Sequence, residues 1–71
     1  MRYIGLTVAT VLRLLRARHI TVTQYREEIN HFSKSLRPDQ VPAGWHVYAA
    51  YLLAPGQVQL FVGPTPTSDQ I

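Results

Sequence analysis

The sequence predicts a single small α+β domain in which two N-terminal helices precede an antiparallel β-hairpin. Three observations carry this prediction. Apolar residues recur at helical spacing as far as residue 36, a Pro-Gly pair separates two apolar runs near the C-terminus, and the 71-residue chain has no cysteine. A chain of this length fits one domain with a small core. We assign that domain to residues 1–63 and a flexible tail to residues 64–71, where Pro, Thr and Ser prevail.

The first predicted helix covers residues 7–17. Thr7 has a side chain suited to the N-cap, and arginines lie on the side that faces away from the core. Residues 1–6 fit either a short strand or part of this helix, and the sequence leaves that choice open. The apolar side of the helix is formed by Val8, Val11, Leu12 and Leu15.

The second predicted helix begins at residues 21–24, which have the Thr-x-x-Gln form of a capping box, and ends before Pro38. Its apolar residues recur at steps of three and four, which is typical of one face of a helix. This stripe predicts a core position for each of its members, Val22, Tyr25, Ile29, Phe32 and Leu36.

The predicted hairpin joins a strand at residues 45–53 to one at residues 58–62 through Ala54-Pro55-Gly56-Gln57. If Leu53 pairs with Val58, one face of the hairpin holds Val47, Ala49, Tyr51, Leu53, Val58, Leu60 and Val62, and the other holds Tyr48, Ala50, Leu52, Gln59 and Phe61. Both faces are largely apolar. Two helices cover one face, so the second is either an interaction surface or is covered by residues 1–6 or by the first helix.

The exposed second face predicts a small, non-enzymatic accessory or regulatory protein that acts by protein–protein binding, with self-association included. We expect Trp45, Tyr48, Leu52 and Phe61 to contact the protein partner, because aromatic and large apolar side chains dominate such interfaces. An inhibitor of host machinery encoded by a phage or mobile element is one form that such a protein takes.

The alternative is a nucleic-acid-binding regulator of helix-turn-helix or winged-helix type. The net charge is +3, and Arg13, Arg16 and Arg18 would contact phosphates while the hairpin served as the wing. Glu27 and Glu28 oppose this function on the second predicted helix, because a phosphate backbone repels carboxylates.

Enzymatic, metal-dependent and membrane functions have little support in the sequence. There is no Gly-rich phosphate loop, no cysteine nucleophile and no serine elbow, so we expect neither catalytic residues nor a cofactor. Glu27 and Glu28 lie near His31, but no second Glu-x-x-His completes a metal site. The apolar run at residues 4–12 is too short for a membrane span and leads into arginines, which favours a cytoplasmic protein.

Two short segments resemble a known family. Ser35-Leu36-Arg37-Pro38 followed by Val41-Pro42-Ala43-Gly44-Trp45 is similar to the Ser-Leu-Trp-Pro and Pro-Ala-Gly-Trp segments of MbtH-like proteins, which activate adenylation domains of peptide synthetases. Arg37 replaces the family's first tryptophan, the spacer is shorter, and a predicted hairpin stands where the family has a helix. The resemblance implies a partner-binding accessory protein but does not assign the family.

Overall fold

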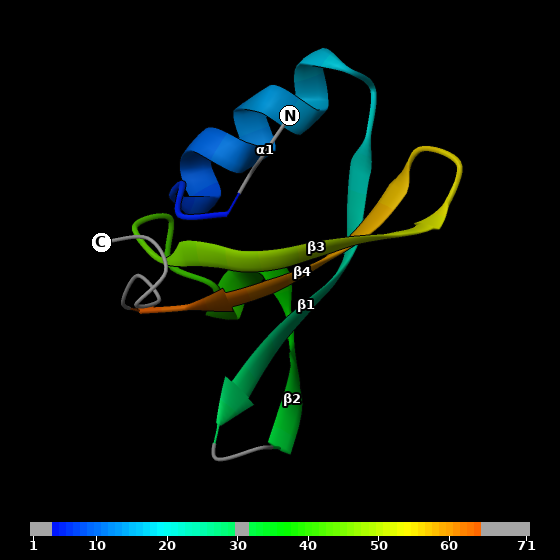
Figure 1. The fold of residues 1–71 in the computed structure, drawn as a ribbon. Coiled ribbons are helices and arrows are strands. Elements are labelled where there is room, and N and C mark those ends of the chain that lie inside the picture. Colours follow the sequence, from blue (N-terminus) through cyan, green and yellow to red (C-terminus); the bar gives the residue numbers. More distant parts are fainter. Residues whose placement is uncertain (1–3, 30–31, 65–71) are drawn as a thin grey trace.

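The computed structural model describes residues 4–29 and 32–64, which form one helix and a four-stranded mixed sheet (Figure 1). In chain order the elements are α1 (Val8–Ala17), β1 (Thr21–Ile29), β2 (Phe32–Leu36), the 3₁₀ turn η1 (Pro38–Gln40), β3 (His46–Ala54) and β4 (Gln57–Gly63). The spatial order of the strands is β2-β1-β4-β3. The predicted architecture of two helices followed by a hairpin is therefore wrong.

The first helix is confirmed, and its N-terminus is capped by a distant loop as well as by its own residues. Thr7 Oγ1 accepts a hydrogen bond from the Thr10 amide at 3.3 Å, as expected of an N-cap. The amides of Val8 and Ala9 donate to the carbonyls of Trp45 at 2.7 Å and Ala43 at 3.1 Å. Since the first amides of a helix have no partner within it, the Pro- and Gly-rich loop before β3 fixes where α1 begins.

The end of α1 is closed by a Schellman motif. The Ile20 amide donates to Leu15 O at 2.9 Å and the His19 amide donates to Arg16 O at 3.0 Å, while His19 has a φ of 60°. The Thr21 amide then donates to Gly56 O at 2.8 Å, which ties the helix end to the β3–β4 turn.

The predicted second helix is instead a pair of antiparallel strands, β1 and β2. Tyr25 pairs with Leu36 and Ile29 pairs with Phe32, so only two residues separate the strands. Phe32 is 79% exposed, which contradicts its predicted core position, and the side chain of Ile29 lies outside the described part of the chain. Without this helix, the helix-turn-helix arrangement has no basis in the structure.

A bulge in β1 explains the helical appearance of this segment. The parallel pairing of β1 with β4 joins Val22 to Val58 and Gln24 to Gln59, which leaves Thr23 as an extra residue. Val22 and Tyr25 consequently face the same side of the sheet, although they are three residues apart. The bulge therefore gives this strand an apolar spacing that is otherwise typical of a helix.

The hairpin of β3 and β4 is confirmed, but its register differs from the predicted one. Leu52, and not Leu53, pairs with Val58, and a bulge lies between Val47 and Ala49. Ala50 and Leu52 therefore lie on the side of the sheet that faces α1, and Ala49 and Tyr51 lie on the other side, a reversal of the predicted faces.

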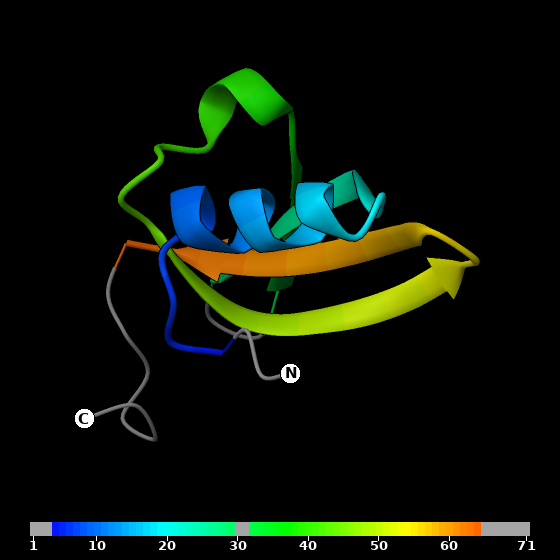
Figure 2. The same ribbon diagram turned by 90° about the horizontal axis from the view of Figure 1, so that it is seen from above.

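The core lies between α1 and the facing side of the sheet. Figures 1 and 2 show α1 above β3 and β4, while the hairpin of β1 and β2 extends away from the helix. Leu15, Val11, Val47, Leu60 and Val62 are almost completely buried there, and Val8, Tyr25 and Val58 complete the buried set. The predicted tail at residues 64–71 lies, apart from Pro64, outside the described residues.

Candidate functional site

The side of the sheet that faces away from α1 carries a row of aromatic residues. Phe61 pairs with Ala49 and lies on this side, next to Tyr51 of the adjacent strand. The rings of Tyr51 and Phe61 meet edge to face, with centroids 5.7 Å apart and planes at 81°. We call the surface formed by Tyr48, Ala49, Tyr51 and Phe61 the aromatic face; none of the described helices and strands lies over it.

Tyr48 belongs to the aromatic face because of the bulge and because residue 63 is glycine. A methyl group on Gly63 would lie 2.6 Å from Tyr48 Cζ, so the tyrosine ring occupies the space that any other side chain would fill. Gly63 lies two residues after Phe61 along β4, so its missing Cβ and the Tyr48 ring that takes its space lie on the same side of the sheet as Phe61.

Polar contacts border the aromatic face on β1 and β2. Gln59 Nε2 donates to Gln24 Oε1 at 2.8 Å. Arg26 donates from Nε to Ser33 Oγ, and from its terminal nitrogen to Ser33 O at 3.2 Å. An apolar centre with a polar rim is the usual composition of a protein–protein interface.

The outer edge of β3 adjoins this face and is also apolar. Among the described residues, its exposed large apolar side chains are Tyr51 at 54%, Leu52 at 71% and Leu53 at 47%, with Ile4 nearby at 52%. Residues 4–7 pair only with the start of β3: the Gly5 amide donates to Val47 O, and the Val47 amide donates to Leu6 O, both at 2.9 Å. From Ala49 onward no described segment pairs with this edge.

The four predicted contact residues do not all lie together. Tyr48 and Phe61 share the aromatic face, and Leu52 lies on the opposite side at the exposed end of the hairpin. Trp45 is half-buried against the core, and its carbonyl binds the start of α1. Tyr51 was assigned to the wrong side because a bulge reverses the alternation of side chains, and the local sequence carries no clear signal of such a bulge.

The three predicted nucleic-acid contacts lie on α1 and its C-terminal cap. Arg13, Arg16 and Arg18 are all exposed. No carboxylate of the described residues forms an ion pair with them. They lie on the helix side of the sheet, away from the aromatic face.

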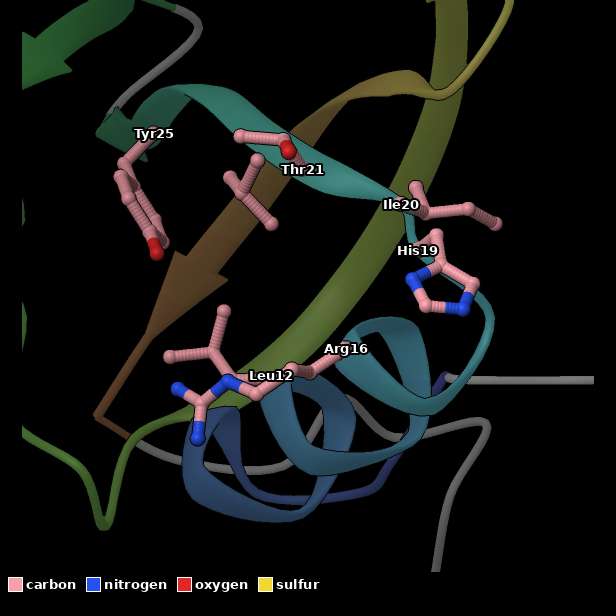
Figure 3. Close-up of a pocket in the computed structure, with 7 residues that line it drawn as sticks. Leu12, Arg16, His19, Ile20, Thr21 and Tyr25 are labelled. Carbon is pink, nitrogen blue, oxygen red and sulfur yellow. The ribbon is translucent and has the colours of Figure 1, made fainter.

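A cavity of about 470 Å³ opens between α1 and β1 (Figure 3). The apolar residues Leu12, Ile20, Val22 and Tyr25 and the polar residues Arg16, His19 and Thr21 line it. Burial raises the pKa of the Tyr25 hydroxyl above its ordinary value. His19 and Tyr25 lie at opposite ends of the cavity in Figure 3, so they do not form an acid–base pair.

Within 4–29 and 32–64, no three His, Cys, Asp or Glu side chains gather as metal ligands would. The helix found in that part of the chain is neither long nor apolar enough to cross a membrane.

Comparison with known proteins adds no relative. No family model, curated protein or solved structure matches the chain.

Proposed function

We propose that this chain is a small, non-enzymatic accessory or regulatory protein of the cytoplasm that acts by binding another protein through the aromatic face. The observation that carries the proposal is the row of Tyr48, Tyr51 and Phe61 on a side of the sheet that no described element covers. Aromatic rings with a polar border are the groups that contribute most to protein–protein affinity.

The internal construction of the face supports the same function. The bulge before Ala49 and the missing side chain at Gly63 together let the Tyr48 ring lie close against β4. The edge-to-face contact restrains Tyr51 against Phe61. Side chains that are already ordered lose less conformational entropy when a partner binds.

Capture of a partner from a lysate of the native host tests this function. The double variant Tyr51→Ala, Phe61→Ala should reduce capture at least about tenfold, since truncation of central aromatic residues typically costs 2 kcal/mol or more. Phe32→Ala is the matched control, because Phe32 is a highly exposed aromatic residue on the other hairpin. Equal capture by the parent and the double variant, with both folded by circular dichroism, would exclude the aromatic face.

Nucleic-acid binding is a second candidate, favoured by Arg13, Arg16 and Arg18, which are exposed and form no ion pair with the described carboxylates. A phosphate contact through these residues is possible without a recognition helix, but it would be weak and non-specific. Nuclease treatment of the lysate separates the two functions. Capture that survives the nuclease supports a protein partner, and affinity for a selected duplex about 10³-fold above random duplex at physiological salt would reverse the order of the candidates.

A further inference from the structure

The outer edge of β3 presents backbone groups as well as apolar side chains. Val47 directs its amide and carbonyl away from β4, because both bond to residues 5 and 6. Backbone direction alternates along an antiparallel strand, and the bulge places Tyr48 and Ala49 together opposite Phe61. The next residues to direct their amides and carbonyls outward are therefore Ala50 and Leu52.

The other edge of the sheet, β2, is protected in ways that β3 is not. β2 contains Lys34 and is followed by Arg37 and Pro38, and charged residues and proline discourage the pairing of exposed edges. β3 spans nine residues from His46 to Ala54 without Lys, Arg, Asp, Glu or Pro. Within residues 4–29 and 32–64, the edge that has no pairing segment and none of these protective residues is β3 from Ala49 onward.

We propose that β3 pairs in antiparallel fashion with β3 of a second copy of this chain, about a two-fold axis at Tyr51. In this register Ala50 of each copy lies opposite Leu52 of the other, so every outward amide and carbonyl of these two residues finds a partner. Because a two-fold axis repeats the same bonds in both copies, one pairing satisfies the exposed edge of each copy.

Side chains and charge favour the same partner. The two Tyr51 residues meet at the axis on the aromatic face, which continues the row from Phe61 of one copy to Phe61 of the other. No like charges meet along β3, although the chain carries a net charge of +3. This inference rests on the proposed function, because the self-pairing enlarges the aromatic face and makes a second copy of the chain one of the protein partners.

The test uses the full chain and two edge variants, with oligomeric state measured by light scattering and sedimentation. Ala50→Pro removes an outward amide without removing a bond to β4, and Tyr51→Lys places like charges opposite each other at the axis. Phe32→Lys is the control on the other hairpin. We expect the parent and Phe32→Lys to be dimers, and both edge variants to dimerise at least about tenfold more weakly.

Hydrogen exchange provides a second measurement that does not depend on variants. In the dimer the amides of Ala50 and Leu52 should be protected at high concentration and should exchange faster on dilution. A parent that stays monomeric at millimolar concentration overturns the proposal, as does a dimer that persists in both edge variants. Protection of these amides in a monomer would mean that the chain covers its own edge, which also overturns it.

This outcome is separable from that of the proposed function. If the parent is a monomer but still captures a partner that Tyr51→Ala, Phe61→Ala loses, only the self-pairing is wrong. If the dimer forms and no variant of the aromatic face affects capture, only the docking function is wrong.

Discussion

Gly63 shows how one residue shapes the candidate surface. Gly63 pairs with His46 of β3, and the ring of the nearby Tyr48 lies where a Cβ of residue 63 would be. The glycine is therefore required by the close approach of this ring to the backbone of β4.

We predict that Gly63→Ala displaces the Tyr48 ring and lowers the free energy of unfolding by about 1–3 kcal/mol, since overpacking a filled site forces side chains from their positions. Gly44→Ala is the matched control, because nothing lies within 4 Å of a methyl group there. Urea unfolding and the chemical shifts of the Tyr48 ring measure the two effects. Unchanged ring shifts in Gly63→Ala would contradict this packing.

Because of Tyr25, we expect the free energy of unfolding to depend on pH in the alkaline range. Burial raises the pKa of its hydroxyl above the ordinary 10.0, so the folded state favours the neutral form more than the unfolded state does. The resulting stability is fully present below pH 10 and is lost as the pH rises through the folded-state pKa. Tyr25→Phe should lose less stability than the parent in urea unfolding as the pH rises above 10.0. Parallel decline of both proteins would contradict the burial of this hydroxyl.

At the scale of elements, the sequence predicted what local interactions determine. The cap at Thr7 and the apolar side of α1 depend on residues within a few positions, and the turn at Pro55-Gly56 is equally local. The helix and the turn were both predicted correctly. The placement of Tyr48 and Phe61 on one face was also predicted, because they lie on adjacent strands of that local hairpin.

The helix predicted for residues 21–36 was wrong because the conformation of this segment depends on pairing with a distant strand. The β-branched run Thr21-Val22-Thr23 favours a strand, and Asn30 favours a turn, but the apolar spacing outweighed both signals. Pairing with β4, more than 30 residues away, introduces the bulge that gives Val22 and Tyr25 a common side. Spacing alone does not distinguish a bulged strand from a helix.

Phe32 should contribute little to stability, although its predicted core position implied a large contribution. Phe32 is 79% exposed on β2, so Phe32→Ala should change the free energy of unfolding by no more than about 0.5 kcal/mol. Leu15 is 2% exposed on α1, so Leu15→Ala should cost about 2–5 kcal/mol through a cavity in a small core. Thermal melts compare the two directly. A larger loss in Phe32→Ala than in Leu15→Ala would restore the helical assignment.

At the scale of the whole molecule, one helix covers one side of a four-stranded sheet, and no other described helix or strand lies over the second side or pairs with β3 from Ala49 onward. A chain of 71 residues buries only about 60% of the surface that its unfolded form exposes. Surface buried against a second copy would add to that small core. The stability of the fold and the self-pairing of β3 are then linked.

Linkage of this kind makes thermal stability depend on protein concentration. Each hundredfold rise in concentration above the dimer Kd adds about 2.7 kcal/mol per dimer, or about half of that per chain. For a domain of this size, the Tm should then rise by roughly 5–10 °C. Calorimetry over that range checks the parent, and in Ala50→Pro the same rise in Tm should begin only at concentrations at least about tenfold higher, because its edge lacks an outward amide. A Tm that is the same at all concentrations in the parent would show that β3 contributes nothing to stability through a second copy.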